Sequence, residues 1–334
     1  MTDSGIDKQG DKLIVAAGES SAKAAAVVEA VKLPSLPEAV AHLLEICRDQ
    51  YVSSQEIVRV VELDPALTAR LLKVANSSFY GQTGKVGTLR RAAVVLGNES
   101  VKAAALGFYL GQGWKYLGHK TFDMHGFWRD CILRACLARQ LARRMEMHPV
   151  EQAFILGMLN DVGTLIMATH FGEEYIAALG RFSGDFVGRR ALEMERFELD
   201  HTQVAAEMAR KWRFPETLVT ALANQCHCPP VQRTNDGACL LWQMAYFCAA
   251  VPFAVDRQTA KVADSLRNLA LGGFGLSFEA LSETFTASVE QFNLLRGVFC
   301  DLSPAECDEA DLLTEAERLM SSFDPEIVDR LEAV

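Results

Sequence analysis

The sequence shows almost none of the two-residue alternation of apolar and polar side chains that is typical of β-strands. It also lacks the basic start and long apolar run of a secretory signal, since Asp3, Asp7 and Asp11 precede only a short apolar patch at residues 13–17. Its nine cysteines have no regular framework spacing, which argues against a disulfide scaffold. We therefore expect a cytoplasmic protein without a β-sheet.

The chain has fewer basic than acidic residues. The chain has 33 Lys and Arg against 43 Asp and Glu, a formal net charge of -10. At long range this charge repels nucleic acid and anionic membranes, so neither is expected as a partner. Residues 238–255 come near the length of a membrane span, but Gln243 and Pro252 interrupt them and favour a buried core helix.

Common catalytic and cofactor-binding motifs are missing as well. The glycines between residues 111 and 118 do not have dinucleotide-loop spacing and follow no strand. Residues 226–228, Cys-His-Cys, lack the second ligand pair of a zinc site. No Ser-His-Asp order and no reactive-cysteine signature stands out, so the cysteines are expected to be structural.

Helical signals fill the chain instead. Ser53 with Glu56 predicts a capping box. Asp64 with Pro65 marks another helix start, because Asp accepts free N–H groups and Pro loses nothing at the first helical position. Longer helices are expected at residues 127–147, 151–171, 203–212, 215–224, 238–250, 277–298, 304–320 and 325–332. A solvated, salt-bridged helix face is expected to carry Arg129, Arg134, Arg139, Arg143 and Arg144. The predicted fold class is all-α, a helical bundle.

Three motifs in one order carry a family resemblance. LPSLPEAV begins at residue 33, ELDPALTARLLKVANSSFYG at residue 62 and AAVVLGNESVKAAAL at residue 92. In wording and spacing the chain resembles the HDOD domain family over residues 32–228. The most recognisable family positions, which we expect to serve caps, turns and packing, are Pro34, Pro37, Asp64, Pro65, Asn76, Ser77, Leu96 and Gly97.

The resemblance implies a degenerate relative of the HD and HD-GYP phosphohydrolases, which hold metal ions with histidines and aspartates. We call the matching positions the remnant HD site: Asp130, Asn160, Asp161, His201, Gln225, Cys226 and Tyr246. Most ligands are replaced, so no catalytic residue, metal or other cofactor is expected. Asp161 is expected to form a buried structural pair with His201 or an arginine, with a ligand role as the alternative.

Four segments are expected: a flexible start (1–20), an N-terminal helical sub-bundle (21–120), a degenerate HD-like part (121–230) and C-terminal helices packed on it (231–334), with a linker at 111–120. The resemblance implies a non-enzymatic bacterial signalling protein that contacts other signalling proteins, such as response regulators or cyclic-dinucleotide enzymes. The alternative is a nucleotide- or metal-binding sensor or weak phosphohydrolase, in which Asp130, Asp161 and His201 hold a cation.

Overall fold

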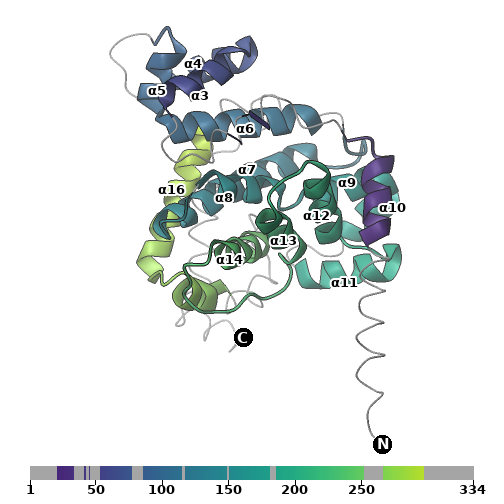
Figure 1. Ribbon diagram of the computed structural model, residues 1–334. Coiled ribbons are helices and arrows are strands. Elements are labelled where there is room, and N and C mark those ends of the chain that lie inside the picture. The colour runs from purple at the N-terminus through teal and green to yellow at the C-terminus, as the bar shows by residue number, and fades with distance from the viewer. Residues whose placement is uncertain are drawn as a thin grey trace, which may run out of the picture.

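The computed structural model describes residues 21–33, 41–42, 45, 53–76, 86–114, 117–148, 150–180, 186–251 and 266–296. Over these residues the secondary structure consists of helices and their connections, without a strand (Figure 1). The predicted all-α class is confirmed. Pro34, Pro37, Ser77 and the helices expected beyond residue 303 lie outside the described residues.

The sub-bundle near the N-terminus consists of α3 (Ser54–Glu62), α4 (Pro65–Ala75), α5 (Leu89–Leu96) and α6 (Asn98–Trp114). In Figure 1, α3, α4 and α5 lie together above the longer α6. The predicted capping box of Ser53 with Glu56 starts α3, and Asp64 caps α4. Gly97, with φ of 78°, ends α5, as expected for a family position that serves a cap or turn.

The predicted linker at 111–120 is wrong in its first part, because α6 continues to Trp114. The Trp114 indole stacks on Trp128 of α7 and on Trp212, with ring centroids 5.9 and 5.2 Å apart. Burial of this aromatic group stabilises the last turn of α6 despite the glycines in it.

The HD-like part is built from α7 (Met124–Arg144), α8 (Val150–Leu159), α9 (Val162–Phe171), α12 (His201–Lys211) and α13 (Glu216–Ala223). α7 packs along α8, and α12 packs against both α9 and α13. Two glycines permit close backbone approach. A Cβ at Gly157 would lie 2.5 Å from the backbone of Ala135, and a Cβ at Gly163 would overlap the carbonyl of His201. The second approach places the start of α9 beside the start of α12, which brings Asp161 near His201.

The continuous helix expected over residues 151–171 is wrong. Asn160 and Asp161 form a turn, and the segment divides into α8 and α9. The sequence indicated no span besides residues 238–255, but by length and composition residues 150–171 could also cross a membrane; 78% of this apolar stretch is buried in the protein. These two helices form part of the core of the bundle.

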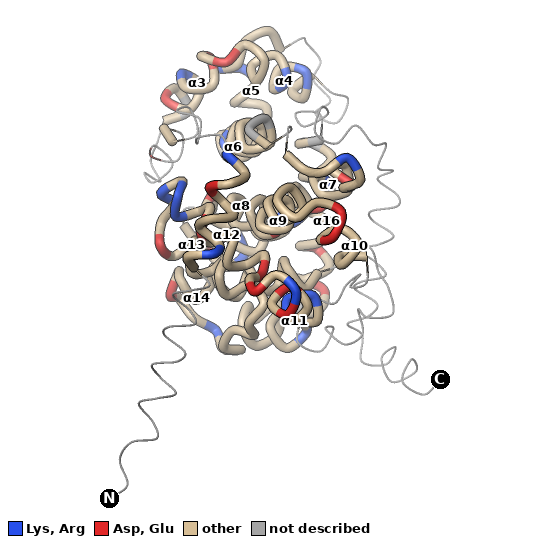
Figure 2. Tube along the Cα trace, turned by 90° about the vertical axis from the view of Figure 1, so that its right-hand side faces the viewer, with Lys and Arg blue, Asp and Glu red and all other residues tan. Residues whose placement is uncertain are grey.

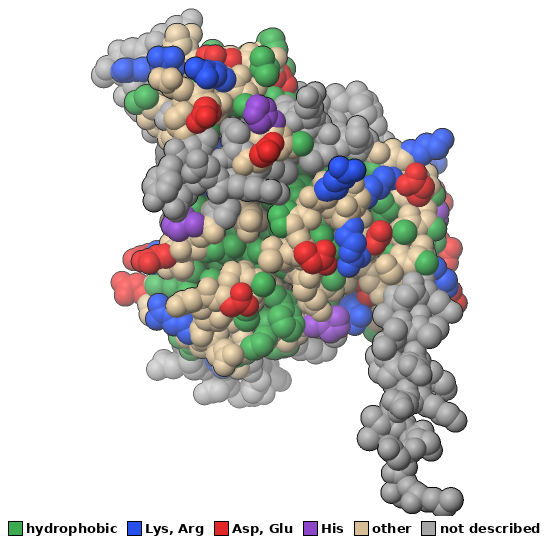
Figure 3. All heavy atoms as spheres, viewed as in Figure 1, with side chains coloured by type: hydrophobic (Ala, Val, Ile, Leu, Met, Phe, Trp, Pro, Cys, Tyr) green, Lys and Arg blue, Asp and Glu red, His purple; other side chains and the backbone are tan. Residues whose placement is uncertain are grey.

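The remaining described helices are residues 21–30, α10 (Glu173–Leu179), α11 (Phe186–Phe197), α14 (Gly237–Ala250), the π-helix η2 (Leu269–Gly273) and α16 (Phe278–Arg296). α14 packs on α13, and α16 packs on α7 (Figures 1 and 2). Ion pair Lys23–Glu198 links the helix at 21–30 to the residue after α11, and ion pair Lys211–Glu29 links it to α12. On the face shown in Figure 3, charges of both signs are interspersed with apolar side chains.

Candidate functional site

Asp161 is the only acidic residue of the HD-type motif that remains, and its carboxylate is fully engaged. Arg134 of α7 donates to one oxygen at 2.6 Å. Arg189 of α11 and the Thr164 hydroxyl donate to the other at 3.4 and 3.2 Å. Burial alone would raise the pKa of Asp161, but Arg134, Arg189 and His201 together hold this pKa well below its ordinary value. Asp161 is therefore an ionised, internally neutralised group.

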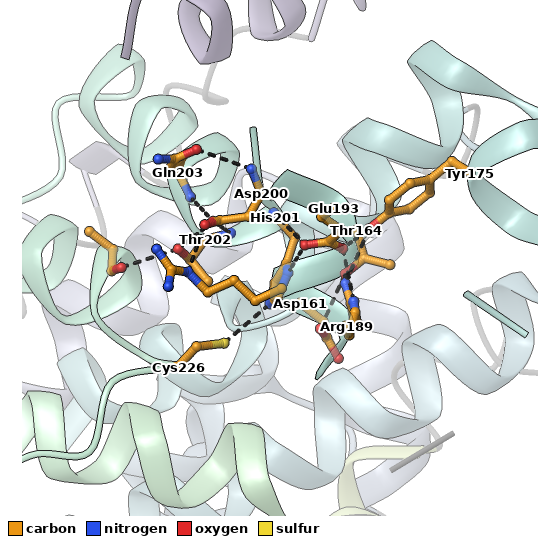
Figure 4. A network of polar contacts seen from close by, with 12 residues as sticks. Asp161, Thr164, Tyr175, Arg189, Glu193, Asp200, His201, Thr202, Gln203 and Cys226 are labelled. Carbon is orange, nitrogen blue, oxygen red and sulfur yellow. Dashed lines mark hydrogen bonds and ion pairs between the residues drawn. The ribbon is translucent and has the colours of Figure 1, made fainter. Parts of the chain in front are cut away.

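Glu193 forms the second centre of the same network (Figure 4). Its carboxylate accepts from His201 Nδ1 at 2.6 Å and from the His201 backbone N–H at 3.0 Å. Tyr175 donates its hydroxyl to it at 2.5 Å, and Arg189 donates Nε at 3.0 Å. Burial opposes ionisation, yet His201 and Arg189 lower the pKa of Glu193. Arg189 thus links both carboxylates.

His201 lies at the start of α12 with 3% of its surface exposed. Its Nδ1 faces Glu193, and its Nε2 lies 3.7 Å from Cys226 Sγ. Burial and Arg189 both disfavour the charged ring, but Glu193 and Cys226 outweigh them and raise the pKa of His201 to about 10. At neutral pH the ring is an imidazolium with both nitrogens protonated.

Asp200 fixes where α12 begins, and so where His201 stands. Its carboxylate accepts the backbone N–H groups of Thr202 and Gln203 at 2.9 and 3.0 Å, and Gln203 returns a bond to the Asp200 backbone. Arg190 donates to the same carboxylate at 2.7 Å. This reciprocal cap orients the backbone N–H of His201 toward Glu193.

The structure gathers only part of the remnant HD site. Asp161, His201 and Cys226 belong to one network. Asp130 pairs with its neighbour Arg129 at 2.8 Å and reaches the network through its charge, which acts on Arg134. Asn160 donates to a backbone carbonyl of α14 at 3.2 Å. Gln225 is 1% exposed, and its amide has no hydrogen-bond partner within the described part of the chain. Tyr246 is buried in α14.

The sequence predicted His201 or an arginine as the partner of Asp161, and the structure shows two arginines there, but the sequence did not identify Arg134 or Arg189. The solvated face expected for the α7 arginines is wrong for Arg134, whose side chain is 11% exposed, and for Arg139, which is 1% exposed. A signal existed for Arg134, because it lies three residues after the core residue Cys131 on the same helix. Arg189 and Glu193 lie on α11, for which the sequence analysis predicted no helix.

The residues present do not fit a metal ion. We call Arg134, Asp161, Arg189, Glu193 and His201 the ion cluster. Its two carboxylates already face two guanidinium groups and an imidazolium, so a divalent cation would meet net positive charge and occupied oxygens. Nowhere in the described ranges do three His, Cys, Asp or Glu side chains gather in a metal-binding group.

Three solved structures share the fold. A protein from Marinobacter aquaeolei VT8, provisionally named a signal transduction protein, is 24% identical with a TM-score of 0.60; the match covers 83% of this chain and 61% of that one. This chain therefore spans less than two thirds of that protein. An HDOD domain protein of unknown function from Geobacter sulfurreducens is 20% identical with a TM-score of 0.60, and the match covers 95% of this chain and 98% of that one.

A protein from Shewanella amazonensis SB2B, provisionally named a phosphohydrolase, is 23% identical with a TM-score of 0.53; the match covers 90% of this chain and 98% of that one. No curated protein matches the chain. The HDOD domain model matches residues 33–228, more than half of the chain and nearly the range of the resemblance. Together with the all-helical bundle, this match shows that the chain belongs to the HDOD domain family.

Proposed function

We propose that the protein is a non-enzymatic regulatory protein, which acts through protein–protein contacts in a bacterial signal-transduction pathway. The observation that carries the proposal is the ion cluster. Arg134 and Arg189 place guanidinium groups against Asp161, at the position where the resemblance would put metal ions. A site neutralised by its own side chains has no charge left to bind a catalytic cation and activate water.

The sub-bundle offers a surface suited to contacts with other proteins. Leu63 at the end of α3 is 81% exposed, and Val94 on α5 is 74% exposed. Both side chains belong to helices of the sub-bundle that pack against each other, and such exposed apolar side chains are candidate contact points for a protein partner. The net charge of -10 favours protein partners over nucleic acid. We propose response regulators or cyclic-dinucleotide enzymes as partner classes.

Metal loading tests the proposal. The full chain is incubated with manganese, iron, magnesium and zinc, and bound metal is quantified by mass spectrometry for wild type, Asp161→Asn and a surface control. Glu207→Gln is a matched control because Glu207 lies on α12, next to exposed Arg210 and outside the ion cluster. We expect only trace metal in all three proteins. Near-stoichiometric metal in wild type and Glu207→Gln that is lost in Asp161→Asn would contradict the proposal.

A second measurement addresses the sensor alternative. Thermal unfolding is recorded with and without nucleotides and cyclic dinucleotides, because a ligand that binds only the folded state raises Tm by mass action. We expect no shift in Tm at ligand concentrations up to the millimolar range. A concentration-dependent rise that Arg134→Met removes and Arg210→Met retains would favour a phosphate sensor.

A further inference from the structure

Glu193, His201 and Cys226 lie in a row, an arrangement that the family resemblance did not predict. Glu193 Oε2 is 2.6 Å from His201 Nδ1, and His201 Nε2 is 3.7 Å from Cys226 Sγ (Figure 4). The acid therefore contacts one ring nitrogen and the thiol contacts the other. This is the order of a nucleophile, its proton partner and the group that orients that partner.

The imidazole is held firmly in this orientation. Besides the ring, Glu193 binds the His201 backbone N–H, the Tyr175 hydroxyl and Arg189. All of these groups come from α10, α11 and α12, which are fixed by the same network. Because Nε2 of this fixed ring faces the sulfur, His201 is placed to exchange a proton when Cys226 acts as a nucleophile.

Other described cysteines have different surroundings. Cys131, Cys136 and Cys248 are buried like Cys226, but none of them contacts a histidine of the described chain, and burial raises the pKa of each of these three thiols. Cys228 is exposed, and its Sγ lies 3.7 Å from the carbonyl of Pro229. Within the described residues, the histidine contact is made by Cys226 alone.

We propose that Cys226 is a nucleophilic thiol that small electrophiles and hydroperoxides modify, with His201 as its proton partner. With a hydroperoxide, the thiolate sulfur attacks one peroxide oxygen, so that an S–O bond forms and the O–O bond breaks. The sulfur is oxidised to sulfenic acid and the peroxide is reduced. The departing hydroxide or alkoxide takes a proton from the His201 imidazolium and leaves as water or alcohol.

The residue that precedes the thiol, Gln225, carries a buried amide. It precedes Cys226, is 1% exposed, and has both an amide donor and an acceptor without a partner among the described residues. Buried amides are rarely left without a partner in native proteins, so an ordered water or a small polar molecule is the expected partner of this one. Because Cys226 itself is 8% exposed, only reagents of small size are expected to reach its sulfur. This inference goes beyond the proposed function and is independent of it.

The test is site-resolved thiol labelling of the folded full chain. Brief exposure to iodoacetamide at neutral pH is followed by peptide mass spectrometry, for wild type, His201→Asn and Glu193→Gln. Because an ordinary free thiol is only a few per cent thiolate at pH 7, we expect His201→Asn to slow labelling of Cys226 about tenfold and to leave Cys228 unchanged. Cys226 in wild type should also label faster than Cys131, Cys136 and Cys248.

The oxidation step is tested with dilute hydrogen peroxide followed by a sulfenic-acid-selective dimedone probe. Dimedone adducts are expected at Cys226 in wild type and absent in Cys226→Ser. If wild-type Cys226 labels no faster than the three buried cysteines, or forms no dimedone adduct, the proposal is overturned. This comparison within one folded molecule holds even where His201→Asn does not fold, and far-UV circular dichroism reports the fold of each variant.

Discussion

The sub-bundle and the HD-like part use their family residues in opposite ways. In the sub-bundle, Asp64 caps the helix that follows it, and the Asn76 amide bonds to Leu72 and to both backbone groups of Val86, at 2.7 to 2.9 Å. These bonds join residues at most ten positions apart. In the HD-like part, Asp161 binds Arg134 and Arg189, each more than 25 positions away. Local bonds fix elements, whereas distant ion pairs hold the elements together.

This difference predicts different costs of substitution. A residue in a local bond affects one helix end, and water can replace part of what it loses. A residue in the ion cluster leaves buried charge behind when it is removed. Substitutions in the two regions should therefore separate by size of effect.

Arg189→Met should have the largest effect. Arg189 contacts Asp161, Glu193, Thr164 and Tyr175, so its removal leaves the buried Glu193 and the partly buried Asp161 carboxylates with less compensation. Breaking a buried ion pair in this way costs about 3–5 kcal/mol of unfolding free energy. Urea denaturation of wild type and variant measures this loss of unfolding free energy.

The matched control for this prediction is Arg210→Met. Arg210 pairs with Glu207 on the exposed side of α12, and a surface change of this kind should stay within about 0.5 kcal/mol. Equal losses in both variants would show that the ion cluster contributes no more than a surface pair.

Acid should weaken the protein less than Arg189→Met, because protonation neutralises the carboxylates instead of leaving them charged and unpaired. Asp161 and Glu193 have lowered pKa values in the folded protein. They therefore stabilise the fold above their ordinary pKa values, 3.8 and 4.5, and this stabilisation falls as the pH drops below these values. The raised pKa of His201 acts in the alkaline range. The stabilisation that protonated His201 gives the fold is complete below pH 6.5 and is lost as the pH rises through about 10.

The measurement is Tm as a function of pH from 2 to 11. We expect a broad maximum between about pH 5 and 7, a steep acid limb and a shallower alkaline limb. Glu193→Gln should flatten both limbs, because it removes one acid and the partner of His201. If the Tm curves of Glu193→Gln and of the control Glu207→Gln both follow the wild-type curve, the Glu193–His201 pair does not govern the pH dependence of stability.

Gly163→Ala should destabilise by about 1–3 kcal/mol, since the added methyl group would overlap the His201 carbonyl and force α9 away from α12. Gly237→Ala is the control, because a Cβ there meets no atom within 4 Å. Urea denaturation compares the two variants. Similar stability for both would mean that α9 can move away from α12 without loss of unfolding free energy.

The same contrast explains what the sequence could predict. The capping box at Ser53, the Asp64 cap and the break at Gly97 follow from residues that lie close together in the chain. The all-α class follows from the same local patterns. The division of residues 151–171 into two helices depends on the contacts of Asn160 and Asp161 with other helices, and no local pattern reports such contacts.

The candidate site was predictable only in part. Motif order pointed to Asp161, His201 and Cys226, which the structure brings into one network. Arg189 and Glu193, which complete it, lie on a helix that the sequence pattern did not predict. Their role depends on how α11 packs against α9 and α12, which is a property of the assembled bundle.

Asp64→Ala should give the smallest loss of unfolding free energy, about 1 kcal/mol, because the main role of Asp64 is to cap α4, beside one side-chain hydrogen bond with Tyr109 of α6. Asp64→Asn is its internal control, since the amide oxygen can still accept the N–H groups of Ala66 and Leu67. Urea denaturation should place Asp64→Asn near wild type and Asp64→Ala well above Arg189→Met in stability. A loss from Asp64→Ala as large as that from Arg189→Met would show that Asp64 supports more than its own helix. The contrast between local caps and the distant ion cluster would then have to be abandoned.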